Sequence, residues 1–394
     1  MTTLKKEKIP ELQLVRALCI IAVVTVHATS YATLQMTGSR YFAIYNFLNI
    51  FMKYGTPTFI AMSAFVLFYN YNERPVNKAL LTSFYKKRFL YILLPYFMFS
   101  LFYFALTQLA VGSPFNGELI RNFFVKLFTG KAYTHLYFVF INMQFYLLFP
   151  FLLLLFKRYP QIRKYSIAAG ILIQWGFILA NKYHFQVANR GSWCLTYFSY
   201  YMLGAWLGMY YPQIKTWIEA HRSEQTKKNN PPGMVFRGIW AIWLTSGISH
   251  TMLYYQNRRY GTSFNSLIYE LLYSTFAFTS LLVLMSVARF LLRKSSLSFL
   301  YQPLERLGSF SFGVYLIHPL FLLLYRQLSP TISTSWLLHL WYVGGFIIAL
   351  GFSWIAVSLL AGYLPFAWVL FGNVSQNKKE GSHTTSHRSS PAFK

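Results

Sequence analysis

Apolar runs about as long as a lipid bilayer is thick recur along the whole chain. A helix rises about 1.5 Å per residue, so roughly 20 apolar residues cross the hydrocarbon core of about 30 Å. Ten such runs are present, at residues 12–31, 46–69, 89–111, 135–156, 165–181, 193–211, 236–255, 265–288, 309–328 and 336–362. The pattern therefore predicts an all-α integral membrane protein with ten transmembrane helices.

The segments outside these runs are shorter or more polar. Residues 119–128 mix Phe and Leu with two basic residues, which favours a short helix lying in the membrane interface. Residues 365–371 are too few to cross the bilayer again, and the polar stretch 213–235 is interpreted as a cytoplasmic loop. We expect one membrane domain, residues 1–372, followed by a disordered cytoplasmic tail, residues 373–394.

The composition excludes several other classes of protein. Of the 394 residues, 55% are apolar and 11% are charged, and the mean hydropathy is +0.38, whereas a soluble domain has about 25% charged residues. A soluble enzyme, a disordered chain and a nucleic-acid-binding module are therefore excluded. Cys19 and Cys194 both lie in apolar runs, where we expect neither a structural disulfide nor a metal cluster.

Positive charge is distributed unevenly between the predicted loops. The net charge of +27 comes from 36 Lys and Arg against nine Glu, with no Asp. With a cytoplasmic N-terminus, 25 of the basic residues fall in cytoplasmic segments, nine in the opposite loops and two within spans. Because basic residues favour the cytoplasmic side, both termini are predicted to be cytoplasmic, in a multi-pass protein of the cell membrane.

The first apolar run follows Lys5, Lys6 and Lys8, so a cleaved signal peptide is an alternative to a membrane anchor. Arg16 interrupts the run, however, and further spans follow it. The anchor is therefore favoured.

Arg16 and His27 lie within this first span, where an ionisable side chain costs a few kcal/mol. They are eleven positions apart, about 20° beyond three full helical turns, so both face one side with about 16 Å between them along the axis. Two interpretations remain at this point. Either the two residues form a functional pair, or Arg16 reaches the headgroups and His27 bonds to a neighbouring helix.

The Arg-x10-His spacing resembles the signature of the acyltransferase family 3 membrane proteins. Four further segments resemble that family's motifs in the same order along the chain, with Ala64 replacing a Gly and Tyr91 standing where the family often has an Arg. They are Gly55–Phe59 with Ser63–Phe65, Lys87–Tyr96, His135–Phe138 with Tyr146 and Pro150, and Ser311–Pro319. The resemblance implies transfer of an acyl group, commonly acetyl, from cytoplasmic acyl-CoA to a hydroxyl of a cell-surface carbohydrate. Acyl-CoA is then a donor substrate, and no permanently bound cofactor or metal is expected.

The catalytic candidates are His27, Glu270 and His135. Histidine is the usual base for activating a hydroxyl, and His27 could either deprotonate the acceptor or carry the acyl group itself. Glu270 falls within a predicted span at roughly the depth of His27, so we predict that it orients His27 or contacts the acceptor. The alternative is a Glu satisfied by a helix neighbour or by Lys53. His135 is either a second acid/base or acceptor contact, or a structural histidine. His318, before Pro319, is predicted to tie helices together.

The donor's phosphates require cations at the cytoplasmic side. Arg16 and Arg88 are the candidates for binding the donor, since arginine grips phosphate through a fork of donors. We interpret Lys86 and Lys87 instead as basic residues that keep this segment on the cytoplasmic side. The alternative function is a transporter or flippase for a glycan or lipid-linked sugar, and the lack of inverted repeats favours the enzyme. The expected partners are membrane lipid, acyl-CoA and a carbohydrate acceptor, with no nucleic acid; the sequence does not fix the acceptor's identity or the oligomeric state.

Overall fold

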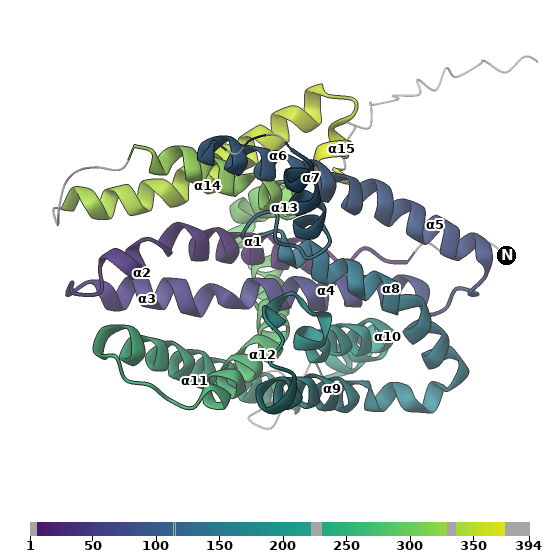
Figure 1. The fold of residues 1–394 in the computed structure, drawn as a ribbon. Coiled ribbons are helices and arrows are strands. Elements are labelled where there is room, and N and C mark those ends of the chain that lie inside the picture. Colours follow the sequence, from purple (N-terminus) through teal and green to yellow (C-terminus); the bar gives the residue numbers. More distant parts are fainter. Residues whose placement is uncertain (1–5, 113, 115, 222–230, 329–335, 375–394) are drawn as a thin grey trace, which may run out of the picture.

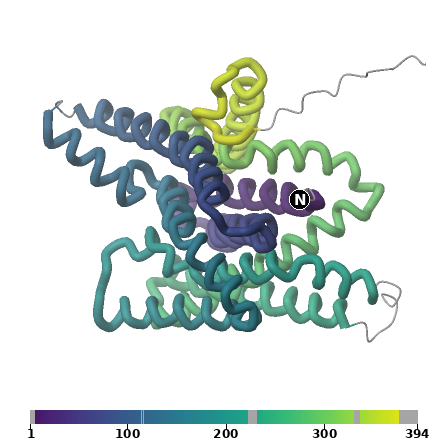
Figure 2. Tube along the Cα trace, turned by 90° about the vertical axis from the view of Figure 1, so that its right-hand side faces the viewer, coloured from purple at the N-terminus to yellow at the C-terminus, as the bar shows by residue number. Residues whose placement is uncertain are grey.

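The computed structural model describes residues 6–374 except 113, 115, 222–230 and 329–335, and every regular element in this part of the chain is helical (Figure 1). The α-helices are α1 (Glu11–Thr29), α2 (Ala32–Gln35), α3 (Phe42–Phe51), α4 (Gly55–Tyr71), α5 (Lys78–Arg88), α6 (Leu94–Val111), α7 (Gly117–Leu127), α8 (Tyr137–Arg158), α9 (Ser166–Ala180), α10 (Phe198–Ala220), α11 (Pro231–Tyr260), α12 (Ser266–Arg293), α13 (Ser298–Arg326), α14 (Trp336–Tyr363) and α15 (Ala367–Phe371). Helix α1 lies near the centre of the bundle, with later helices around it (Figure 2).

Each of the ten predicted spans falls on a helix of the structure. Within the described part of the chain, seven helical stretches are long and apolar enough to cross a membrane: Glu11–Thr29, Phe42–Tyr71, Lys78–Val111, Tyr137–Arg158, Ser266–Arg293, Ser295–Arg326 and Trp336–Tyr363. Helices α9, α10 and α11 are not among the seven. The all-α, multi-pass membrane class is thus supported, while the count of ten and the cytoplasmic termini stay predictions.

Two pairs of helices pack with their backbones in close contact. A Cβ added to Gly308 of α13 would lie 2.0 Å from the carbonyl oxygen of Gln13 in α1, and one added to Gly204 of α10 would lie 1.9 Å from that of Ala61 in α4. Small residues allow such approach between membrane helices. Since Gly208 meets Phe65 one turn further along, α4 and α10 run parallel.

Two apolar cores extend from α1. One joins α4, α8, α10 and α12, and includes the stacked rings of Phe145 and Tyr201 with centroids 4.1 Å apart. The other joins α6, α13, α14 and α15. Cys19 and Cys194 are both buried and free. Helix α1 therefore contributes side chains to both cores.

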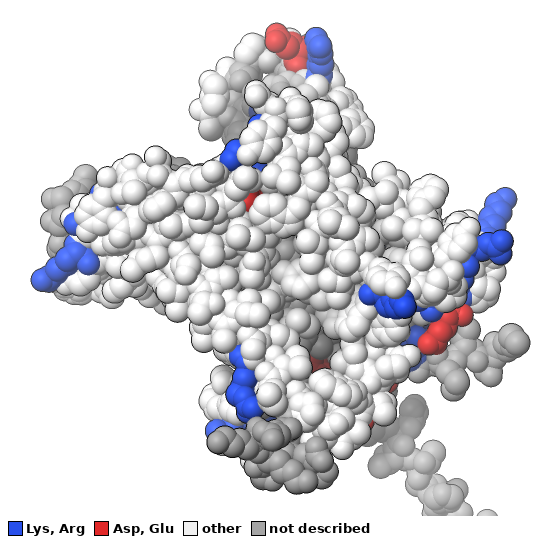
Figure 3. Space-filling model, turned by 90° about the horizontal axis from the view of Figure 1, so that it is seen from below, with Lys and Arg blue, Asp and Glu red and all other residues white. Residues whose placement is uncertain are grey.

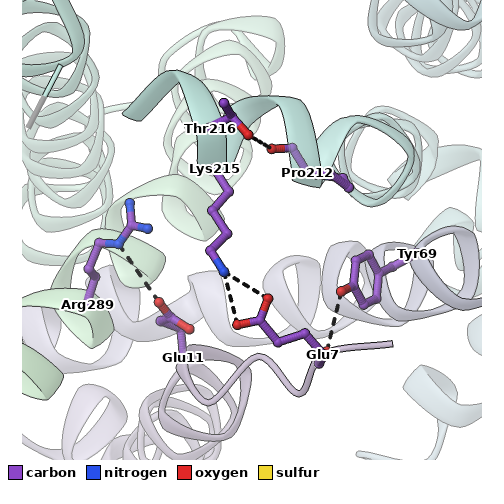
Figure 4. A network of polar contacts seen from close by, with 7 residues as sticks. All are labelled: Glu7, Glu11, Tyr69, Pro212, Lys215, Thr216 and Arg289. Atoms are coloured by element: carbon purple, nitrogen blue, oxygen red, sulfur yellow. Dashed lines mark hydrogen bonds and ion pairs between the residues drawn. The ribbon is translucent and has the colours of Figure 1, made fainter. Parts of the chain in front are cut away.

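Charged side chains fix the start of α1 at one end of the molecule, which we call the Glu11 end; the opposite one is the His27 end. Lys215 of α10 pairs with Glu7, and Arg289 of α12 lies 3.9 Å from Glu11 (Figure 4). The hydroxyl of Tyr69 also donates to the carbonyl of Glu7. In Figure 3 most of the visible face is uncharged and the charged side chains gather toward its extremities, as expected of a protein with an apolar belt.

The structure confirms two of the predictions about short segments and shows that a third is wrong. The predicted helix at 119–128 is present as α7, and the short run at the end contains α15. The stretch 213–235 is not simply a loop, because α10 continues to Ala220 and α11 begins at Pro231. The sequence up to Ala220 contains no breaker after Pro212, and a proline at a first helical position is well tolerated. Residues 375–394 of the expected tail lie outside the described residues.

Candidate active site

A cavity of about 510 Å³ lies beside Arg16, and we call it the arginine cavity. It is lined from α1, α4, α5, α8 and α13, and Arg16, Arg88, Lys87, Tyr146 and Tyr315 are among its lining residues. Among the described residues that line it there is no Asp or Glu. The structure therefore brings together the two arginines that the sequence assigned to the donor.

Neither Arg16 nor Arg88 forms an ion pair with a carboxylate among the described residues, so both keep their positive charge. A π-helical turn, Phe89–Leu93, follows Arg88, and such turns are frequent at functional sites. The Arg88 guanidinium lies over the rings of Phe84 and Tyr146, at 5.3 and 4.9 Å from their centroids, and its Nε has no hydrogen-bond partner in the described part of the chain. Arg16 donates to Gln13 at 3.4 Å. Two cations with free donors suit a phosphate-bearing ligand.

Three histidines from distant parts of the chain form a cluster around His318. The ring centroid of His318, on α13, lies 5.2 Å from that of His27 on α1. It lies 5.6 Å from that of His135, which precedes α8. The structure thus brings two catalytic candidates together through a third histidine, His318, for which only a structural role was predicted. No signal along the chain predicted this grouping.

Hydrogen bonds indicate which nitrogens carry protons. The Nδ1 of His318 contacts the carbonyls of Tyr315 at 2.8 Å and Val314 at 3.2 Å, so it must be the protonated, donating nitrogen. The Nε2 of His135 similarly donates to the carbonyl of Leu316 at 3.3 Å. The remaining nitrogen of each ring is buried without a partner among the described residues. Each ring therefore presents a lone pair that can accept a proton.

The His27 imidazole differs from the other two. It is half-buried, whereas His135 and His318 are 1% and 0% exposed. It has ring contact with His318 but no hydrogen bond to another described side chain or carbonyl. A general base needs an accessible ring with a free lone pair, and His27 meets this requirement.

Tyr315 links the arginine cavity to the histidines. Its ring lines the cavity and lies 5.1 Å from His135 and 6.1 Å from His318 between centroids. Its hydroxyl donates to the backbone carbonyl of His135. Tyr315 therefore borders the cavity that Arg16 and Arg88 line, and ring contacts lead from it through His318 to His27. Tyr315 was noted in the sequence only as part of a motif.

Glu270 has a different neighbour from those considered in the sequence. It forms an ion pair with Arg190, which lies between α9 and α10. Lys53 lies over the ring of Tyr254, 5.1 Å from its centroid. The ring contact of His27 comes from α13, so a role for Glu270 in orienting His27 stays a prediction. In the described residues no three His, Cys, Asp or Glu side chains are grouped so that they could hold a metal ion.

The helical bundle and its buried polar site define an integral membrane protein in which Tyr315 joins a cation-lined cavity to a histidine cluster. The model of the family described as "Acyltransferase domain" matches residues 9–358, and the chain belongs to this family, acyltransferase family 3. No solved structure matches the chain.

Two curated relatives are similar over most of their length. One from Staphylococcus aureus, named "Probable poly-beta-1,6-N-acetyl-D-glucosamine export protein", is 24% identical over 339 residues, 81% of this chain and 83% of the relative. One from Staphylococcus epidermidis with the same name is 26% identical over 341 residues, 81% of this chain and 82% of the relative.

Proposed function

We propose that this protein transfers an acetyl group from a CoA thioester, bound at the arginine cavity, to a hydroxyl of a cell-surface carbohydrate that approaches His27. The coarser part of this function, an acyltransferase of the membrane, follows from the family. The donor, the acetyl group and the acceptor are the proposal. The observation that supports it is a series of neighbouring groups: Arg16 and Arg88 line the same cavity as Tyr315, and ring contacts join Tyr315 through His318 to His27.

The two ends of this series suit the two substrates. Phosphates of the donor would meet the guanidinium groups of Arg16 and Arg88, which have no carboxylate partner in the described residues. The distance along α1 from Arg16 to His27 is about 16 Å, which the donor's flexible pantetheine arm can bridge. Phosphate binding and proton transfer are therefore separated along one helix.

The reaction requires two proton transfers, from the acceptor hydroxyl to His27 and from His27 to the CoA thiolate. His27 takes the proton of the acceptor hydroxyl while its oxygen attacks the thioester carbonyl, and the carbon–sulfur bond breaks. The protonated imidazole then returns the proton to the CoA thiolate, so the products are an ester and free CoA. In the alternative route the acetyl group passes first to the His27 ring and then to the hydroxyl.

Export of a polysaccharide is the second candidate, and a specific observation favours it. Both curated relatives carry the name of an export protein for poly-β-1,6-N-acetyl-D-glucosamine. The same bundle could move a polymer without acylating it. The two functions differ in what happens when the base is removed.

The deciding experiment replaces His27 with Ala and follows two quantities in cells, labelled acetyl ester on surface polymer and the amount of polymer at the surface. The acyltransferase predicts loss of ester with polymer still exported. Loss of export with normal ester content would overturn it and favour the transporter. His184→Ala is a matched control, because His184 is exposed and has no part in the ring contacts of the cluster.

A further inference from the structure

A second cavity, of about 790 Å³, lies on the other side of the first turn of α8 from the arginine cavity, and we call it the lysine cavity. Its walls come from the end of α6, the turn after α7, the first turn of α8 and the segment before α10. The neighbours Tyr137 and Phe138 line different cavities, Tyr137 the lysine cavity and Phe138 the arginine cavity. The first turn of α8 therefore separates the two.

A glycine turn builds one wall of this cavity. Helix α7 ends in a pair of bonds typical of a helix stop, from the amide of Lys131 to the carbonyl of Lys126 (2.8 Å) and from that of Gly130 to that of Leu127 (3.4 Å). Gly130 has φ +71, and a Cβ there would lie 2.8 Å from Phe140. The turn thus requires glycine, and it directs the chain from Lys131 to His135 across the start of α8.

The opposite wall is braced from α8. The side-chain amide of Gln144 donates to the carbonyl of Ser192 at 2.8 Å and accepts from the amide of Cys194 at 3.0 Å. The hydroxyl of Tyr197 donates to the carbonyl of Gly191 at 3.0 Å. These contacts hold Asn189, Gly191 and Ser192 against the cavity. Both walls are therefore fixed by the protein's own hydrogen bonds.

The lysine cavity adjoins the reactive end of the site. Tyr133, which lines it, stacks on Tyr103 at 4.3 Å and lies 5.7 Å from the His135 ring. Thr134, the next residue, is exposed in the cavity wall. A ligand filling this space would lie beside Tyr133, whose ring contacts His135, and the first turn of α8 would separate it from a donor in the arginine cavity. That is the place the second substrate needs.

The charged side chains that line the lysine cavity, among the described residues, are all positive. Lys126 and Lys131 line it, and no Asp or Glu does among its described lining residues. Lys126 lies over the Phe104 ring at 5.3 Å, and neither lysine has an ion pair in the described part of the chain. The nearby Arg190 is already paired with Glu270. Clefts lined by charge of one sign attract ligands of the other sign.

Apart from Val111, Ala132 and two glycines, the remaining lining residues carry tyrosine rings, hydroxyls or amides, and they include Tyr133, Tyr137, Tyr197, Thr107, Gln108 and Asn189. Aromatic rings with polar tips and side-chain amides bind polyhydroxylated ligands by stacking and hydrogen bonding. The geometry points to the lysine cavity as the acceptor subsite, and to an acidic oligosaccharide, with a carboxylate or phosphate held by Lys126 and Lys131, as the acceptor. This inference rests on the proposed function and adds that the carbohydrate acceptor is negatively charged.

The test uses a pair of probes that differ only in charge. Purified protein in lipid nanodiscs is given acetyl-CoA and either a hexameric oligogalacturonide or the same oligomer with its carboxylates reduced to alcohols. We expect the acidic oligomer to have the lower KM, and Lys131→Glu to raise that KM about tenfold while changing the KM for the reduced oligomer little. The control is Lys182→Glu, because Lys182 bonds to Asn265 away from the cavity.

Two outcomes would overturn the inference: equal KM values for the two oligomers, or a Lys131→Glu effect no greater than that of Lys182→Glu. Direct binding of the two oligomers, measured by calorimetry without donor, separates it from the proposed function. Binding of the acidic oligomer that Lys131→Glu removes, with no transfer to either oligomer, would retain the subsite and reject the acyltransferase. Transfer with no preference for charge would retain the acyltransferase and reject the acidic acceptor.

Discussion

Arg326, the last residue of α13, donates a hydrogen bond of 2.7 Å to the backbone carbonyl of His27, although 299 positions separate them. The same Nη2 atom lies 3.0 Å from the hydroxyl of Ser30, and the guanidinium lies 3.7 Å from the centroid of the Tyr31 ring. Arg326 thereby holds the last turn of α1, where the proposed base lies, against α13, which carries His318.

Arg326→Gln is expected to lower kcat about tenfold, because the turn that carries His27 loses a charge-assisted bond worth about 1.5–3 kcal/mol. The KM for acetyl-CoA should change little, since Arg326 lies at the His27 end. Steady-state kinetics in nanodiscs checks both, and Arg326→Lys should restore part of the rate. A variant with unchanged kcat and only a lower melting temperature would reduce Arg326 to a structural residue.

His318→Asn tests the histidine cluster. Asparagine can retain a donor to the carbonyl of Tyr315 while removing the ring nitrogen that lacks a partner. We expect kcat to fall about tenfold or more, in the range of general acid–base effects, with a normal melting temperature. If transfer stays at the wild-type rate, His318 only joins helices, as the sequence suggested.

Arg88→Gln tests the donor side. It removes a guanidinium with an unpartnered Nε from the arginine cavity, so the KM for acetyl-CoA is expected to rise about tenfold, the cost of about one charge-assisted bond. Lys86→Gln is the matched control, since Lys86 lines a separate surface groove. Equal effects of the two substitutions would indicate that only the general positive charge matters.

Glu270→Gln tests the remaining catalytic candidate. Its ion pair with Arg190, whose neighbours Asn189 and Gly191 line the lysine cavity, favours a contact with the acceptor over orientation of His27. We expect the acceptor KM to rise several-fold. Arg190→Gln controls for loss of the ion pair itself. Near-normal transfer by the Glu270→Gln protein in every parameter would rule out both roles.

Gly204→Ala tests the close packing of α10 on α4 and should affect stability rather than chemistry. The added Cβ would lie 1.9 Å from the carbonyl oxygen of Ala61, so the helices must separate at a cost of about 1–3 kcal/mol. Thermal unfolding followed by fluorescence-detected gel filtration should show a lower midpoint. Gly351→Ala has open space around its Cβ and should be neutral; a lower midpoint there as well would contradict the packing argument.

Local features of the chain were predictable because they depend on residues close in sequence. The apolar runs coincide with helices, since an apolar segment in a bilayer can satisfy its backbone hydrogen bonds internally only as a helix. The spacing of Arg16 and His27 fixed their common face, because the helical repeat is constant. The extension of α10 into the stretch 213–235 was missed, since the polar composition there is compatible with both a loop and an exposed helix.

The sequence by itself determined an all-helical membrane protein of the acyltransferase family. It also determined that Arg16 and His27 lie on one face of the first helix. Only the tertiary structure decided that His318 joins His27 to His135, that Glu270 pairs with Arg190, and that a cavity with two lysines borders the cluster. The reason is physical. Helix formation is fixed by neighbours along the chain, whereas the contacts of a buried polar group depend on which helices pack together and at what rotation, and those helices lie up to about 300 residues apart.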